Sequence, residues 1–190
     1  MAEIDGKIVD ALARVSQAFR VLLRKEGKLS ALSPIQIQIL VFLLFQSGEA
    51  CYVTALARQF DLTKATVSDS IKSLAEKCLV AKYADPADIR SYTVVLTGLG
   101  REQVRKSSGF TSAIEKPLDM LSPMQKEIIF TGLFQLIGQL HLAGIISIQK
   151  MCFTCCHYDQ AGRGHYCKLL KTGMGNQELK IDCEDHQLRR

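Results

Sequence analysis

The sequence predicts a mainly helical α+β fold in which one small β-hairpin accompanies the helices. Two kinds of pattern indicate it. Residues 54–97 divide into a short helix at 54–60, a tight break at 61–62, an amphipathic helix at 63–77 and a hairpin at 79–97. Serine-proline-x-glutamine segments at 33–36 and 122–125 match the capping-box pattern, so a helix begins at each. These helices should end near residues 45 and 146.

The second helix of the 54–97 segment has one apolar side and one polar side. Apolar residues recur at i, i+4, i+7 and i+11, namely Val67, Ile71, Leu74 and Cys78. The open faces carry short donors and lysines, namely Lys64, Thr66, Ser68, Asp69, Lys72 and Ser73. Such a face suits a DNA groove, although the helix alone fits a plain helical bundle equally well. The hairpin that follows it favours DNA.

In the hairpin, strands at 80–84 and 92–96 flank a turn-rich, charged tip at 85–90. A hairpin tip beside a recognition helix can lie along a minor groove. Three motifs complete the pattern, namely Val67-Ser68-x-x-Ile71-x-x-Leu74-x-x-Lys77-x-Leu79-Val80, Asp85-Pro86-x-Asp88-x-Arg90 and Leu96-Thr97-x-x-Gly100. Over about residues 1–148 the chain resembles the MarR (multiple antibiotic resistance regulator) family of bacterial winged helix-turn-helix transcription factors. We therefore expect a MarR-like domain at 1–148 and a separate tail at 149–190.

The resemblance implies a transcriptional regulator, most simply a repressor, that binds double-stranded DNA. Hydroxyls and amines in the first turns of the recognition helix should reach base edges or nearby phosphates, namely those of Thr63, Lys64, Thr66 and Ser68. Lys72 is better placed for a backbone phosphate. Arg90 matches the minor-groove arginine of the wing, and Asp88 is the carboxylate expected to orient it.

Two positions depart from the family pattern. A carboxylate at Asp69 repels phosphates unless it accepts a hydrogen bond from a cytosine amine, so either the operator has a particular base there or Asp69 turns away. Cys78 stands where many relatives have glycine, so the turn into the wing must form with a side chain present. Cys51 and Cys78 could be redox switches, but small buried hydrophobes are the commoner use of isolated cysteines.

The first and last helices of the expected domain each carry a broad apolar side. The N-terminal seam consists of Ile4, Ile8, Leu12, Val15, Phe19 and Leu22, and the later stripe of Ile129, Leu133, Leu136, Ile137, Leu140 and Ile145. Packing within the chain is one interpretation. The family interpretation, which we favour, is a homodimer whose two recognition helices lie about one helical turn (~34 Å) apart, which predicts a pseudo-palindromic operator.

Composition is compatible with a compact cytoplasmic protein. The chain of 190 residues is 47% hydrophobic and 23% charged, enough for one sizeable core and a small appendage. Its longest apolar run, at 39–45, is too short to span a membrane, and no leader opens the chain. A net charge of +5 permits a polyanionic partner. No Gly-rich phosphate loop, His-Glu-x-x-His or nucleophile-base pair is present, so we do not expect an enzyme.

The tail is rich in metal-ligating residues and poor in apolar ones. Five of the seven cysteines and three of the four histidines fall in it. Because disulfides are uncommon in the cytoplasm, clustered thiols there indicate a metal. The expected ligands are Cys152, Cys155, Cys167 and Cys183, with His165 and His186 as substitutes and Cys156 as a bystander. Similar segments, at 152–155, 165–170 and 181–186, occur in the tails of some winged-helix regulators.

The identity of the metal stays open at this point. Four thiolates usually hold structural zinc, which is the leading interpretation. The same donors also hold an iron–sulfur cluster, which would make the chain a redox-sensing regulator. A tail of free thiols without metal is the third alternative.

Two further functional alternatives remain. The winged fold could serve protein contacts in a small metal or redox protein that does not bind DNA. MarR-like proteins also often release DNA when a small aromatic effector binds, and Phe45, Tyr52, Phe110 and His141 are the residues that could line its pocket. Each of these four fits a core or surface position better.

Overall fold

The computed structural model describes residues 2–46, 51–85, 88, 91–107, 109–147, 150–161 and 164–189. These residues form two compact units. The first comprises Met1–Leu56 and Lys64–Glu115, and the second comprises Ala57–Thr63 and Lys116–Arg190. Each unit is described by itself.

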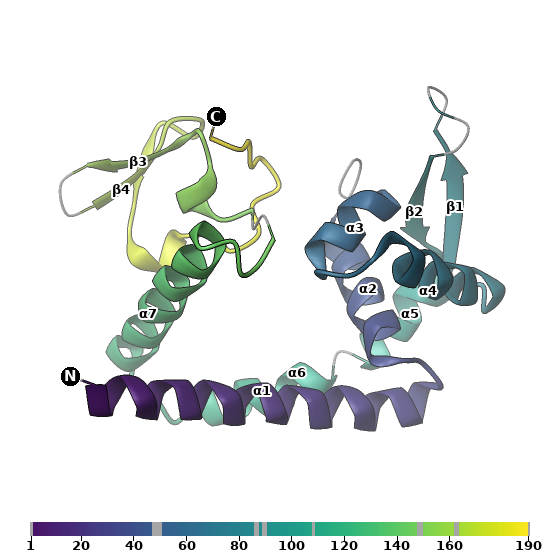
Figure 1. Ribbon diagram of the computed structural model, residues 1–190, viewed down its shortest axis with the longest axis horizontal. Coiled ribbons are helices and arrows are strands. Elements are labelled where there is room, and N and C mark those ends of the chain that lie inside the picture. The colour runs from purple at the N-terminus through teal and green to yellow at the C-terminus, as the bar shows by residue number, and fades with distance from the viewer. Residues whose placement is uncertain are drawn as a thin grey trace. The chain divides into compact units, whose positions relative to one another are not determined.

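Helices dominate the chain, and its strands are short (Figure 1). The helices are α1 (Ala2–Ser30), α2 (Pro34–Phe45), α3 (Val53–Gln59), α4 (Lys64–Glu76), α5 (Gly98–Ser107), α6 (Gly109–Leu118) and α7 (Pro123–Leu142). The strands are β1 (Val80–Ala84), β2 (Tyr92–Leu96), β3 (Tyr158–Ala161), β4 (Gly164–Cys167) and β5 (Thr172–Met174), and two short 3₁₀ turns are η2 (Cys152–Thr154) and η3 (Asn176–Glu178). The predicted fold class, mainly helical with a β-hairpin wing, is confirmed.

Both predicted capping boxes are present. At the start of α2, the Ser33 hydroxyl accepts from the Gln36 backbone N–H (3.3 Å), and the Gln36 side chain accepts from the Ser33 N–H (2.9 Å). Ser122 and Gln125 make the same pair of bonds at the start of α7. Each box satisfies N–H groups that a helix end leaves without partners. The prediction for the end of α7 was wrong, because the helix stops at Leu142 and the chain turns through Gly144 with φ of 70°.

The core of the first unit lies between α2, α4, α5 and the hairpin. Helix α2 forms its inner wall, as expected, and buries Ile37, Ile39, Leu40 and Leu43. Val80, Val94 and Leu96 cover this core from the hairpin. Strands β1 and β2 have the predicted bounds and pair antiparallel from Val80↔Leu96 to Ala84↔Tyr92.

The join between the hairpin and α5 explains the third sequence motif. The Thr97 hydroxyl donates to the Cys78 carbonyl (2.7 Å) and accepts from the Gly100 N–H (3.0 Å), so it caps α5 and fixes the turn before β1. A Cβ on Gly100 would lie 1.9 Å from the Leu79 carbonyl oxygen. Only glycine therefore allows α5 to approach the start of the wing this closely.

Gly100→Ala should destabilise the first unit by about 1–3 kcal/mol, because backbone must move to admit the methyl group. The measurement is the free energy of unfolding in a denaturant titration. Gly98→Ala is the matched control, since it adds a methyl in the same helix with nothing within 4 Å. Equal stability of the two variants would contradict the close approach.

The second unit joins the tail to α7. Its core consists of Phe134, Met151, Cys152, Cys155, Tyr158 and Leu179, with Phe130, Ile137, Phe153 and Met174 packed against it. Phe134 belongs to α7 and is fully buried (0% exposed). The tail thus shares a core with α7, and the packing unit that contains both consists of Ala57–Thr63 and Lys116–Arg190. The boundary at 148/149 stays a prediction.

The tail itself is a three-stranded antiparallel sheet in the order β3-β4-β5, flanked by η2 and η3. In Figure 1 its strands and turns follow the end of α7. Among the described residues, no single helix is both long and apolar enough to cross a membrane; α1 (from Glu3) and α2 meet those criteria only as a pair, and they are bent by 91° at the break.

Candidate nucleic-acid interface

The turn between α3 and α4 is tight and hydrogen-bonded. The Leu62 N–H donates to the Ala57 carbonyl (2.9 Å) and the Asp61 N–H to the Arg58 carbonyl (3.2 Å). Asp61 has φ of 50°, a left-handed conformation that aspartate tolerates better than most side chains. This is the break that the sequence predicted at 61–62, and it separates the two helices of the expected motif.

The burial of individual side chains shows which side of α4 faces solvent. Val67, Ile71 and Leu74 are fully buried (0% exposed), as predicted. The polar side chains of Thr63, Lys64, Thr66, Asp69 and Lys72 are exposed, and that of Ser68 is half-buried. All six were predicted to face DNA; five of them lie on the open side of α4, and Thr63 directly precedes the helix.

The end of α4 corrects one expectation. Cys78 was predicted to continue the apolar side of the helix, but it is exposed and has φ of 56°. The helix ends at Glu76, and the Leu79 N–H bonds back to the Leu74 carbonyl (2.9 Å), which places residue 78 in the left-handed position where glycine is usual. Cys51, in contrast, is buried.

A groove of about 440 Å³ opens beside the start of α4. Lys64, Ala65 and Ser68 form its α4 side, Ser91 and Tyr92 its wing side, and Tyr52, Val53 and Thr54 its third side. The Tyr52 hydroxyl donates to the Asp85 carboxylate (2.6 Å), and Tyr52 pairs with Thr93 as an isolated bridge. These contacts hold the third side against the wing.

The sequence did not single out Thr54 or Ser91 for this interface. Thr54 and Ser91 meet at the groove because Tyr52 pairs with Thr93. This contact joins residues far apart in the sequence, so local periodicity does not predict it. With Lys64 and Ser68 they give the groove three hydroxyls and one ammonium group. Such groups donate to phosphate oxygens.

The described part of the wing tip is closed by serine and aspartate. The Ser91 hydroxyl donates to the Asp88 carboxylate (3.0 Å), and the Ser91 N–H donates to the Asp88 carbonyl (2.8 Å). Arg90 lies outside the described residues, so the predicted role of Asp88 in orienting it stays a prediction.

Two further lysines near the motif have structural contacts. The Lys77 ammonium group donates to the Ala31 carbonyl, so this residue of the first motif ties the end of α4 to the α1–α2 turn. The Lys82 ammonium group lies 4.9 Å from the centroid of the Tyr92 ring, within the range of a cation–π contact.

The residues considered for an effector pocket have other surroundings. Phe45 is 66% exposed, and Tyr52 is bonded to Asp85. The His141 Nδ1 atom lies 3.2 Å from the Ser147 carbonyl oxygen. Phe110 lies outside the residues whose side chains are described.

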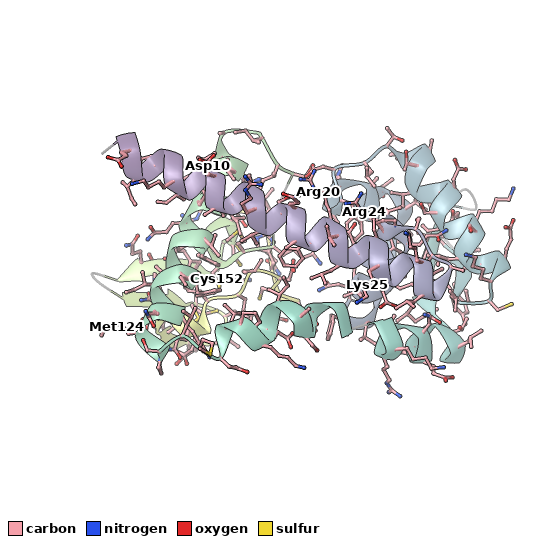
Figure 2. All side chains as sticks on the ribbon, turned by 90° about the horizontal axis from the view of Figure 1, so that it is seen from below. Asp10, Arg20, Arg24, Lys25, Met124 and Cys152 are labelled. Carbon is pink, nitrogen blue, oxygen red and sulfur yellow. The ribbon has the colours of Figure 1, made fainter. Side chains whose placement is uncertain are left out.

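Large apolar surfaces stay uncovered on α1 and α7. Ile4, Ile8, Val15 and Phe19 of the α1 seam are between 38% and 56% exposed, and Ile128, Ile129, Leu133 and Leu136 of α7 are between 37% and 65% exposed. Helical periodicity places charged residues such as Asp10, Arg20 and Arg24, labelled in Figure 2, on α1 away from the seam. Within α7, Phe134 and Gly138 are buried, and Ile129, Leu133 and Leu136 of the predicted stripe are exposed.

In the tail, all four predicted metal ligands belong to one small region. Cys152 and Cys155 are buried, Cys167 and Cys183 are half-buried, and none of the seven cysteines forms a disulfide. Burial raises the pKa of the Cys152 thiol, the Lys180 N–H lowers it, and the Cys183, Cys155 and Cys167 thiols raise it further. Among the described residues, no three Cys, His, Asp or Glu side chains are grouped so that they could hold a metal ion.

Comparisons with known proteins agree with the winged helix. Residues 32–91 match the model of the MarR family. The crystal structure of the S. aureus MepR–DNA complex is 20% identical, covers 70% of this chain and 97% of that chain, and has a TM-score of 0.61. A MarR-family regulator from Silicibacter pomeroyi is 22% identical, with coverages of 74% and 94% and a TM-score of 0.62.

A MarR transcriptional regulator from Methanosarcina mazei Go1 is also 22% identical, with coverages of 74% and 98% and a TM-score of 0.59. At these identities the likeness shows the fold. No curated protein matches the chain significantly. The family match covers α2, the helix-turn-helix and most of the wing, and the structure folds that segment as a winged helix. Residues 32–91 are therefore similar to the MarR family, and the likeness to the solved structures shows that the chain has a winged helix-turn-helix fold.

Proposed function

We propose that the protein acts as a homodimeric repressor that binds a pseudo-palindromic operator through α4 and the wing. The observation that carries this proposal is the open face of α4. Three fully buried residues fix the orientation of the helix, and the side chains turned outward include hydroxyls, lysines and the Asp69 carboxylate. Helices of this kind enter the major groove, where such groups reach base edges.

Each residue has a role in this arrangement. Thr63, Thr66 and Ser68 supply hydroxyls to base edges or nearby phosphates, and Lys72 binds a backbone phosphate. Lys64 lines the groove together with Ser91 and Thr54, so it is best placed for the phosphate that passes between α4 and the wing. The solved complex of MepR with DNA supports this use of the fold.

Asp69 is exposed on the same helix, so it does not turn into the core. Its carboxylate is repelled by phosphates and is compatible with a cytosine amine donor. We therefore include Asp69 as a specificity residue. It selects against operators that lack a donor at that position.

The dimer is supported by the apolar residues left exposed on α1 and α7. Monomeric soluble proteins rarely expose contiguous apolar patches of this extent. We expect a second copy of the chain, with its own α1 seam and α7, to cover these apolar residues, as the resemblance to the family implies. Two-fold symmetry then presents two copies of α4 to successive major grooves. The small aromatic effector stays a prediction from the resemblance.

The test is a fluorescence anisotropy titration of the full chain against duplex DNA at increasing salt. Affinity should fall by at least ~100-fold between about 50 and 200 mM salt, because lysines release counterions from phosphates. The competing function, a winged fold used for protein contacts, predicts no DNA affinity at any salt. That result would overturn the proposal.

A further inference from the structure

The first two cysteines of the tail form a tight turn. Cys152 opens the 3₁₀ turn η2, and the Cys155 N–H donates to the Cys152 carbonyl (3.0 Å). A Cys-x-x-Cys turn of this kind sets two sulfur atoms on one side of the backbone, which is the usual first half of a thiolate metal site. The Cys152 sulfur also accepts the Lys180 backbone N–H (3.3 Å), a bond that favours a thiolate.

The last cysteine lies on the segment that pairs with this turn. The Cys152 N–H donates to the Lys180 carbonyl (3.1 Å), and the Cys183 N–H donates to the Lys150 carbonyl (2.9 Å). These two bonds run between the same two segments in opposite directions. They place Cys183 beside Cys152, although the two are far apart in the sequence.

The third cysteine reaches the same place through the β-sheet. Cys167 is the register partner of Tyr158, and the Tyr158 N–H donates to the Cys155 carbonyl (3.2 Å). Backbone bonds therefore bring the segments that carry Cys167 and Cys183 onto residues 150–158, where Cys152 and Cys155 lie. Cys152 is labelled in Figure 2.

Three other possible donors of the tail have partners of their own, whereas the buried Nε2 atom of His157 has no hydrogen-bond partner among the described residues. The Tyr158 hydroxyl is bonded to Nδ1 of His165 (2.7 Å), and Nε2 of His165 is bonded to the Asn176 side-chain oxygen (3.0 Å), so both ring nitrogens are used. The His186 Nε2 atom is bonded to the Thr154 hydroxyl (2.8 Å). The Cys156 thiol points to the Gln187 side chain.

We propose that Cys152, Cys155, Cys167 and Cys183 form a tetrathiolate site that binds one Zn²⁺ ion. Four thiolates at tetrahedral positions are the donor set of closed structural zinc sites. Each thiol releases its proton to solvent as it binds, and the ion neutralises part of the charge that burial disfavours. The four side chains are not grouped as a metal site in this structure, so the proposal requires their sulfur atoms to move together when the ion binds.

Because of its position, the proposed site should affect how the tail packs on α7. Cys152 and Cys155 belong to the same core as Phe134 of α7, and Phe153 packs against Phe134 with ring centroids 4.6 Å apart. The Asn176 side chain, bonded to His165, also donates to Glu127 of α7 (2.9 Å). Metal binding therefore stabilises the packing of the tail on this helix. The site itself does not depend on the proposed DNA binding.

The experiment is a metal count on the full chain, purified under reducing conditions, with zinc affinity measured by competition with a chromophoric chelator. Wild type should hold about one Zn²⁺ per chain. Cys167→Ser and Cys183→Ser should each lower the zinc affinity by ~10-fold or more, because each removes one ligand. Cys156→Ser, the matched control, should bind zinc as wild type does. Circular dichroism establishes that each variant keeps its helices.

Co²⁺ added to the metal-free wild-type chain gives a second readout that needs no variant to fold. Tetrahedral thiolate coordination should produce strong sulfur-to-cobalt charge-transfer absorption, and Zn²⁺ should displace it. A folded, reduced chain that binds neither ion would overturn the proposal, and so would zinc binding unaffected by both ligand substitutions. Iron with acid-labile sulfide would overturn the zinc assignment. None of these readouts involves DNA, so their failure is distinguishable from failure of the proposed function.

Discussion

The double variant Lys64→Ala, Lys72→Ala should bind duplex DNA on the order of 100-fold more weakly than wild type at about 0.1 M salt. Both ammonium groups lie on the exposed face of α4, and a dimer loses four of them. The loss should be similar for operator and random duplexes, because phosphate contacts carry little sequence information. Fluorescence anisotropy with labelled duplexes measures it.

The control for this variant is Lys106→Ala, Lys168→Ala, which changes the net charge equally. Those lysines belong to α5 and to the tail, where they pair with Glu102 and Asp159. The control should retain nearly all of the affinity. Equal losses in the two double variants would mean that net charge, and not the face of α4, controls binding.

The second large effect is expected from charges placed in the α1 seam. Ile8→Glu, Val15→Glu puts two carboxylates on a face that we assign to the dimer interface, so the protein should sediment as a monomer at micromolar concentration. Operator affinity should then fall by ~1000-fold, because each half-site is bound separately. Analytical ultracentrifugation and anisotropy measure the two effects.

Val9→Glu, Val21→Glu is the matched control for the seam. Both valines are exposed on α1 and, by helical periodicity, lie away from Ile8 and Val15. This variant carries the same added charge and should remain a dimer with operator affinity close to that of wild type. A wild-type chain that is itself monomeric would contradict the assignment of the seam.

The elements best predicted from the sequence are those set by local chemistry. The strands of the wing are bounded by turn-forming residues at 85–90, and the period-2 pattern of Val80, Val94 and Leu96 fixes which face is buried. The capping boxes at Ser33 and Ser122 were predicted for the same reason. A cap needs only residues three apart, so its signal is complete in the sequence.

The remaining features depend on contacts distant in sequence. The burial of Phe134 on α7 was not predicted, because this residue packs against the tail, whose apolar residues are few and irregularly spaced. The groove beside Lys64 depends on the pairing of Tyr52 with Thr93, and Cys78 left the apolar side of α4 because the helix ended before it. Local periodicity contains none of these contacts.

The most direct measurement of the central claim is the dependence of DNA affinity on salt for wild type and for Lys64→Ala, Lys72→Ala. If α4 binds DNA through these lysines, the slope of log K against log salt should become shallower by about four per dimer, close to one for each ammonium group that no longer neutralises a phosphate. An unchanged slope, with the fold of the variant intact, would contradict the assignment of α4 as the DNA-binding helix.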